Sequence, residues 1–206
     1  YTLEDMADDA AALLDHLGID RAHIVGASMG GMIAQVFAAR FRRRTRSLAA
    51  IFSSNNRRFL PPPAPRSLLS ILYGPPPNSP RDVIIDNAVR VSRIIGSPGY
   101  PAPEERIRAE AIESYERSYY PWGIARHFGA ILGTGSLVEY DRQITAATVV
   151  IHGLADKLMR PSGGRAVARA IDGARLVLYE GLGHDLPEEL WDPVISELTT
   201  TFTEGA

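Results

Sequence analysis

Residues 22–40 read AHIVGASMGGMIAQVFAAR, and this stretch decides the fold. Its first five residues form a short apolar run, which predicts a buried strand. Residues 29–40 carry apolar side chains at helical spacing, which predicts a helix directly after the strand. Between the two, residues 26–30 match the pattern Gly-x-Ser-x-Gly and place Ser28 in a sharp turn from strand to helix.

The turn around Ser28 suits a nucleophile. A serine in so sharp a turn needs small neighbours two residues before and after it, which would account for Gly26 and Gly30. The turn would expose the serine Oγ above the sheet, and the backbone N–H of Met29 would face a developing oxyanion. A glycine-rich phosphate loop is the alternative, but the chain lacks Gly-x-Gly-x-x-Gly, and its one lysine, Lys157, is far from the turn.

A free serine hydroxyl is a weak nucleophile, so the sequence must also supply a base and a carboxylate that orients it. Asp156 follows an apolar run at residues 147–151, and His184 follows another at residues 176–179. Because both runs predict buried strands, both side chains would lie in loops at the carboxyl edge of a sheet. The order serine, aspartate, histidine is the one that accompanies a Gly-x-Ser-x-Gly turn. We therefore predict Ser28, Asp156 and His184 as nucleophile, acid and base.

Other titratable residues are weaker candidates for the base or the acid of the triad. His152 is the second candidate base, but its place at the end of a predicted strand favours a structural hydrogen bond. Asp185 is next to His184 and is expected to point away from it. No two histidines stand three or four residues apart with a carboxylate partner, so we expect no metal site.

The rest of the chain largely repeats the strand and helix pattern. A buried strand is expected at residues 47–53, a helix at residues 162–171, and a final helix with Asp192 as its N-cap. Thr2 and Asp5 predict a capping box at the start of a first helix. Buried strands that alternate with helices predict an α/β fold with a mostly parallel sheet flanked by helices.

Residues 55–143 break this pattern. Most of the 15 prolines lie here, and helices are expected to begin at Pro80 and Pro103. We expect a helical, proline-rich cap at 55–143, inserted between core segments at 1–54 and 144–206. Four aromatic residues in or beside the cap are expected to line a substrate pocket: Phe52, Tyr119, Tyr120 and Trp122.

The composition restricts the kinds of binding partner and the cellular location that we expect. The 22 basic and 24 acidic residues give a formal net charge of −2, which argues against nucleic acid as a partner. No apolar run approaches the ~18 residues of a membrane span. The chain has no cysteine and opens without the features of a signal peptide, so a cytoplasmic location is expected.

Three motifs carry a family resemblance: GASMGG at 26–31, IHGLADKLMRP at 151–161 and GLGHDLP at 181–187. On these the chain resembles the α/β-hydrolase superfamily, and within it bacterial carboxylesterases of the aclacinomycin methylesterase-like group. The resemblance covers nearly the whole chain. It implies an α/β-hydrolase fold with a helical cap, and a small-molecule carboxylic ester as substrate. It also implies hydrolysis through an acyl-enzyme without a cofactor.

The chain departs from the superfamily at its start. Members have further strands upstream, and the second oxyanion donor lies in a loop after the third of them. We therefore expect that the N-terminal part of the domain, with that donor, is missing here, so that the chain holds only the second half of the sheet. The predicted strand at 22–26 would then have an open edge, which predicts a homo-oligomer.

Other functions remain open on the same residues. A cofactor-free haloperoxidase or perhydrolase would use the same triad, and only an assay with peroxide and a carboxylate separates it from an esterase. A non-catalytic ligand-binding protein on the same fold is favoured by the missing oxyanion donor and disfavoured by the complete set of triad residues. Dehalogenases and epoxide hydrolases are disfavoured, because they carry aspartate where this chain has Ser28.

Overall fold

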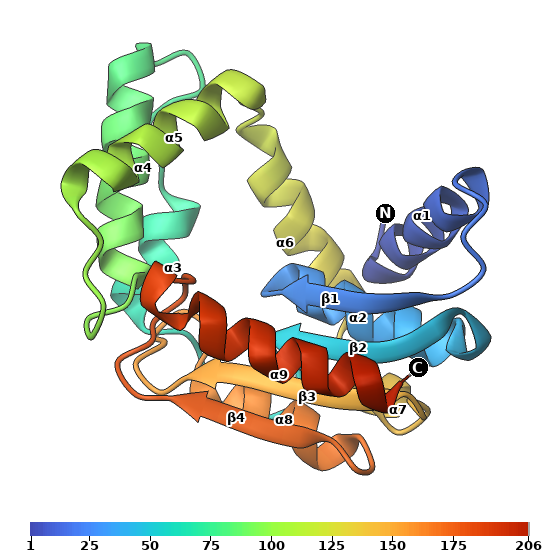
Figure 1. The fold of residues 1–206 in the computed structure, drawn as a ribbon. Helices are drawn as coiled ribbons and strands as arrows, with labels where there is room; N and C mark the ends of the chain where they lie inside the picture. The colour runs from blue at the N-terminus through green and yellow to red at the C-terminus, as the bar shows by residue number, and fades with distance from the viewer. Residues whose placement is uncertain (206) are drawn as a thin grey trace.

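A computed structural model describes residues 1–205. Its centre is a parallel four-stranded sheet with the strand order β1-β2-β3-β4 (Figure 1). The strands are β1 (Ala22–Ala27), β2 (Thr45–Ile51), β3 (Ala147–Gly153) and β4 (Arg175–Tyr179). All four predicted strands are present, with ends that differ by one or two residues. The strand predicted at 47–53 begins and ends two residues earlier, because the chain turns away from the sheet at Phe52, whose φ is 35°.

Helices cover both faces of the sheet and its carboxyl edge. Those that flank the sheet are α1 (Leu3–His16), α2 (Met29–Arg40), α8 (Pro161–Ala170) and α9 (Trp191–Glu204). Those between β2 and β3 in the chain are α3 (Pro65–Leu72), α4 (Arg81–Ile95), α5 (Glu104–Arg117), α6 (Trp122–Thr134) and α7 (Val138–Asp141). Two short 3₁₀ helices complete the described elements: η1 (Arg42–Arg44) and η2 (Glu188–Leu190). Within residues 1–205, no helix combines the length and the apolarity needed to cross a membrane.

The core lies on the two faces of β2 and β3. Successive side chains of a strand point to opposite faces, and here Leu48 and Val150 pack with α2 and α8, whereas Ile51 and Ile151 pack with Val194 of α9. Each of these buried aliphatic side chains stabilises the fold by roughly 1.5–3 kcal/mol. The sheet is therefore covered on both faces, and its loops at the carboxyl edge are held on a rigid base.

The structure confirms one predicted helix start and corrects another. The capping box of α1 is confirmed, since the backbone N–H of Asp5 donates to Thr2 Oγ1 at 3.3 Å and that of Thr2 donates to Asp5 Oδ2 at 2.6 Å. The N-cap predicted at Asp192 is wrong. Helix η2 runs directly into α9, so Leu190 takes the N-cap position and Asp192 lies in the first turn. There its charge still suits the positive end of the helix dipole.

The segment between β2 and β3 is helical, as its sequence predicts. Helices α4 and α5 begin directly after Pro80 and Pro103, which occupy the N-cap positions. We call α3, α4, α5 and α6 the cap helices. Figure 1 shows α4, α5 and α6 as an arch above the carboxyl ends of the strands, where the loops with Ser28, Asp156 and His184 lie.

Candidate active site

Ser28 lies between β1 and α2 in a backbone conformation that few side chains adopt. Its φ is 53° and its ψ is −122°, a region that costs a non-glycine residue of order 1–3 kcal/mol. Two contacts with the end of β2 hold it there. The Ser28 N–H donates to the Ile51 carbonyl at 2.9 Å, and the Ser53 hydroxyl donates to the Ser28 carbonyl at 2.8 Å. The strained turn is thus fixed by the neighbouring strand.

Glycines make this turn possible, but not all of those predicted. A Cβ on Gly26 would overlap the carbonyl of Gly30, so the first glycine of the motif is required. A Cβ on Gly30 would meet nothing within 4 Å, so the structure gives no steric reason for a glycine at this position, contrary to what the motif predicts. The glycine required after the serine is Gly31, where a Cβ would lie 2.6 Å from Ser53 Cβ because α2 passes the end of β2 there.

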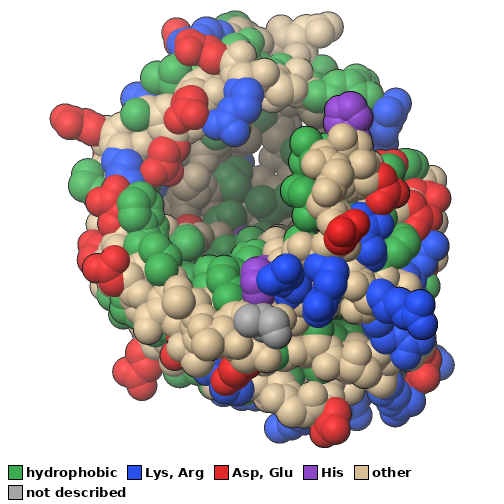
Figure 2. Space-filling view, turned by 45° about the vertical axis from the view of Figure 1, so that its right-hand side comes forward, with side chains coloured by type: hydrophobic (Ala, Val, Ile, Leu, Met, Phe, Trp, Pro, Cys, Tyr) green, Lys and Arg blue, Asp and Glu red, His purple; other side chains and the backbone are tan. Residues whose placement is uncertain are grey.

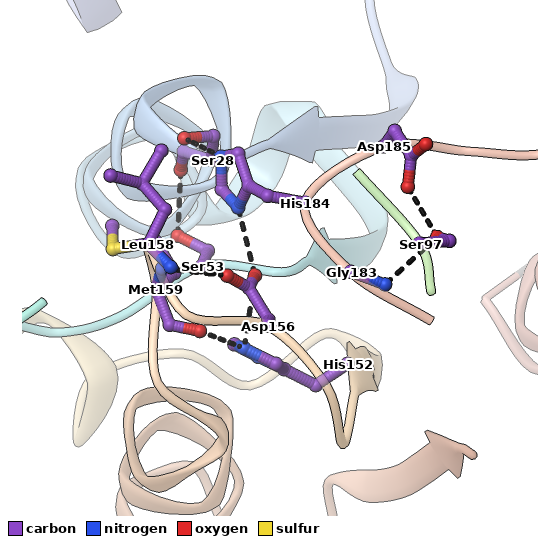
Figure 3. Close-up of polar contacts among 10 residues, drawn as sticks. All are labelled: Ser28, Ser53, Ser97, His152, Asp156, Leu158, Met159, Gly183, His184 and Asp185. Atoms are coloured by element: carbon purple, nitrogen blue, oxygen red, sulfur yellow. Dashed lines mark hydrogen bonds and ion pairs between the residues drawn. The ribbon is translucent and has the colours of Figure 1, made fainter. Parts of the chain in front are cut away.

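The structure brings together the three residues predicted as a triad (Figure 3). Ser28 Oγ is 2.9 Å from His184 Nε2, and His184 Nδ1 is 2.8 Å from Asp156 Oδ2. The second carboxylate oxygen of Asp156 accepts the backbone N–H groups of Leu158 and Met159, each at 2.8 Å. Because the carboxylate accepts the proton on Nδ1, a neutral His184 presents the lone pair of Nε2 to the serine hydroxyl.

His152 is close to this row but points elsewhere. Its Nε2 donates to the Met159 carbonyl at 2.8 Å and is 3.7 Å from Asp156 Oδ2. The side chain is fully buried, and burial lowers its pKa, so the imidazole stays neutral. The structural hydrogen bond predicted for His152 is confirmed. It ties β3 to the loop whose N–H groups bind Asp156.

The loop that carries His184 is fixed by contacts that the sequence did not reveal. The backbone N–H of Gly183 donates to Ser97 Oγ at 2.8 Å, and the Ser97 hydroxyl donates to a carboxylate oxygen of Asp185 (Figure 3). The prediction that Asp185 points away from His184 is confirmed. A Cβ on Gly183 would overlap the carbonyl of Gly96, so the histidine loop and the segment after α4 touch backbone to backbone.

A cavity of about 910 Å³ opens above Ser28 and His184. Apolar side chains from the cap helices and from residues 60–63 form most of its wall, and Figure 2 shows hydrophobic side chains inside the hollow. One face of α6 contributes Ile124, Phe128 and Ile131. Their spacing of four and three residues is a helical pattern, and this signal could have identified them from the sequence.

The aromatic residues predicted to line the pocket lie outside its wall, which corrects that expectation. Phe52 is buried with its ring centroid 4.9 Å from that of His184, beside the histidine. Tyr119, Tyr120 and Trp122 are 37%, 52% and 62% exposed, at the start of α6 or just before it. They lie between the end of α5 and the first residue of α6, and other apolar side chains line the cavity, Phe128 among them.

The predicted oxyanion donor is at the start of α2. Met29 is the first residue of this helix and lines the cavity. A backbone N–H at that position has no acceptor within its own helix, and the helix dipole favours negative charge beside it.

A serine, an imidazole and a carboxylate in hydrogen-bonded sequence at the carboxyl edge of a parallel sheet define a class of hydrolases. The family model for the alpha/beta hydrolase fold matches residues 1–189, and the chain belongs to this family. The predicted fold class is therefore confirmed.

Similar proteins of this family include several esterases. The rhodomycin D methylesterase of Streptomyces peucetius is 24% identical over 216 residues, which cover 96% of this chain and 72% of that protein. A bifunctional esterase/perhydrolase of Acinetobacter calcoaceticus is 22% identical, covering 91% and 69%. Among solved structures, the meta-cleavage product hydrolase of Pseudomonas fluorescens IP01 has a TM-score of 0.77 at 22% identity and covers 100% of this chain and 73% of its own. At this identity the structural likeness shows the shared fold.

Proposed function

We propose that this protein is a serine hydrolase that cleaves carboxylic esters of small molecules. The observation that carries the proposal is the row Ser28 Oγ, His184 and Asp156, joined by contacts of 2.9 and 2.8 Å. The row lies at the floor of a largely apolar cavity, which suits an ester with an apolar acyl or alcohol group.

In the proposed reaction Ser28 Oγ attacks the ester carbonyl while His184 Nε2 takes the serine proton. The oxyanion that forms would face the N–H of Met29, and Asp156 would stabilise the imidazolium through Nδ1. His184 then gives the proton to the leaving alcohol, which leaves an acyl group on Ser28. A water molecule, deprotonated by the same imidazole, attacks the acyl-enzyme and releases the acid.

The named relatives support an ester as substrate. One is called a methylesterase and another an esterase/perhydrolase, and both align with more than nine-tenths of this chain. This similarity supports ester hydrolysis as the reaction class. Which ester is the substrate depends on the shape and polarity of the cavity.

The test is hydrolysis of p-nitrophenyl acetate and butyrate by the parent and by Ser28→Ala. Loss of one triad member costs of order 10⁴-fold or more in turnover, so we expect the variant to lose activity while its melting temperature stays nearly unchanged. Ser136→Ala is the matched control, because Ser136 also lines the cavity but does not contact His184. Turnover by Ser28→Ala within about tenfold of the parent would contradict the proposal, since a nucleophile cannot be dispensable.

Perhydrolysis is the second candidate, favoured by the name of the Acinetobacter calcoaceticus relative. The same acyl-enzyme would react with hydrogen peroxide in place of water and release a peracid. Peracid formation from acetate and peroxide, lost in Ser28→Ala, would support this activity, and its absence in a protein that cleaves the esters would exclude it.

A further inference from the structure

The wall of the cavity carries cations but no carboxylate. Arg57, Arg58 and Arg160 line it together with His127, and no aspartate or glutamate of the described residues does so. The chain as a whole has more acidic than basic residues and a formal net charge of −2. The cavity wall therefore has the opposite sign to the protein, and it holds positive charge beside a largely apolar surface.

Within residues 1–205 none of these three guanidinium groups pairs with a carboxylate. The Arg58 guanidinium lies 5.7 Å from the centroid of the Phe59 ring, and Arg160 Nε donates to the Pro62 carbonyl at 3.2 Å. Ion pairs do hold several arginines of the cap helices, namely Arg81, Arg93 and Arg108. The arginines at the cavity thus retain hydrogen-bond donors that a ligand can use.

The two segments with these arginines are joined to each other and to the hydrogen-bonded residues Ser28, His184 and Asp156. The backbone N–H of Ala64 donates to the Lys157 carbonyl at 2.7 Å, which holds the segment after Arg58 against the loop before Arg160. Met159, whose N–H binds Asp156, directly precedes Arg160. The two segments that carry the arginines therefore meet at the rim of the cavity that contains Ser28.

We propose that the site takes esters whose apolar chain ends in a carboxylate. The ester carbonyl would lie at Ser28, the chain along the apolar wall, and the distal carboxylate among Arg57, Arg58 and Arg160. Guanidinium groups bind carboxylates through paired, charge-assisted hydrogen bonds, and the absence of acidic side chains from the wall removes a competitor for them. This inference rests on the proposed function and names the substrate class of the same site.

The test compares two methyl esters of the same shape. Monomethyl adipate ends in a carboxylate, and methyl adipamate ends in a neutral amide. We expect kcat/KM at low salt to be about tenfold higher for the anionic ester. This is the size of effect that a charge-assisted hydrogen bond has at a solvent-accessible site. Added sodium chloride should reduce that preference, because exposed charges are screened.

Arginine variants test whether the preference for the anionic ester arises at the cavity wall. The double variant Arg57→Gln/Arg58→Gln and the single variant Arg160→Gln should each bring the ratio of the two kcat/KM values closer to one, and Arg160→Lys should retain part of the preference. Arg126→Gln is the matched control, because this arginine of α6 lies over the Tyr120 ring at 5.4 Å and does not line the cavity. Equal kcat/KM values for the two esters in the parent, or a preference that survives all three neutralisations, would overturn the inference.

Binding to Ser28→Ala separates this inference from the proposed reaction. Calorimetric titration with the two intact esters should show tighter binding of monomethyl adipate. If that difference appears but the parent protein cleaves neither these two esters nor p-nitrophenyl acetate or butyrate, the proposed function fails and the anionic subsite stands. If the parent cleaves both esters and neither measurement favours the anion, the subsite fails and the proposed function stands.

Discussion

His184 donates its backbone N–H to the carbonyl oxygen of Ile95 at 2.8 Å, so the last residue of α4 holds the loop of the proposed base directly. Ser97 adds two further bonds, to Gly183 and Asp185 on either side of the histidine. The position of the imidazole over Ser28 is therefore set by the end of a cap helix as well as by β4. A displacement of α4 would move the base.

Removal of the Ser97 hydroxyl tests this positioning. Ser97→Ala deletes both bonds to the histidine loop, and we expect kcat with p-nitrophenyl butyrate to fall about ten- to a hundredfold, the usual result of a small misplacement of a catalytic group. KM should change little, because Ser97 does not line the cavity above Ser28. Ser97→Thr keeps the hydroxyl and should restore most of kcat, and Ser92→Ala on the exposed side of α4 is the control. A Ser97→Ala variant that melts earlier but keeps its kcat would reduce Ser97 to a structural role.

The choice of base is tested by two glutamine variants. His184→Gln should lose about 10⁴-fold or more in kcat/KM, because no other group then takes the proton from Ser28. His152→Gln should stay within about tenfold of the parent, since the amide can still donate to the Met159 carbonyl. Both are measured with p-nitrophenyl butyrate. If His152→Gln were inactive and His184→Gln active, the base would be His152.

The two glycines of the motif should differ sharply when each becomes alanine. Gly26→Ala forces a Cβ into the Gly30 carbonyl and should prevent folding or cost several kcal/mol of stability, in the range of overpacked backbone sites. Gly30→Ala places its methyl in open space within α2 and should stay within about 1 kcal/mol of the parent. Urea denaturation measures both free energies of unfolding. Equal destabilisation by the two substitutions would show that the turn is packed differently.

Much of this site could be predicted because its residues follow local patterns. The apolar run before Ser28 and those before Asp156 and His184 indicate strands, and parallel strands bring their carboxyl ends to one edge. The chain order of the three residues then identifies which loops should meet. Each inference needed only a few neighbouring residues, which is why the pattern and the structure agree.

What the sequence did not reveal depends on contacts between distant segments. Ser97 and Asp185 are 88 positions apart, and nothing near either residue indicates that they meet. Whether Gly30 or Gly31 has to be small depends on how α2 passes Ser53, and this is a matter of packing. The prediction of which residues line the cavity was wrong for the same reason. The aromatic content of a segment does not indicate which side of the cap helices faces inward.

Asp141 should make stability depend on pH. It is fully buried, accepts one hydrogen bond from Asn55 at 2.8 Å, and its Oδ1 has no partner among the described residues. Burial raises its pKa to about 7, although the Asn55 bond works in the opposite direction. The ordinary pKa of an unfolded Asp is ~3.9. Between these values the folded state holds a proton that the unfolded state lacks, so this group's stabilising effect is complete below about pH 4 and is lost as pH rises through 7.

Asp141→Asn, which is neutral at every pH, should abolish that loss. We expect the free energy of unfolding of the variant, relative to the parent, to rise between pH 5 and pH 8 by roughly 2–4 kcal/mol. Urea denaturation at the two pH values gives both differences. The same difference at pH 5 and pH 8 would show that Asp141 keeps one protonation state over this range.

A fluorophosphonate probe tests most directly whether His184 and Asp156 activate Ser28. Trypsin cleaves after Arg21 and Arg40 and releases residues 22–40, in which Ser28 is the single serine. Mass spectrometry of that peptide therefore locates the adduct without ambiguity. We predict one phosphonyl group on Ser28 in the parent protein and almost none in His184→Gln. A folded parent that remains unlabelled, or an adduct at a serine outside this peptide, would contradict the claim.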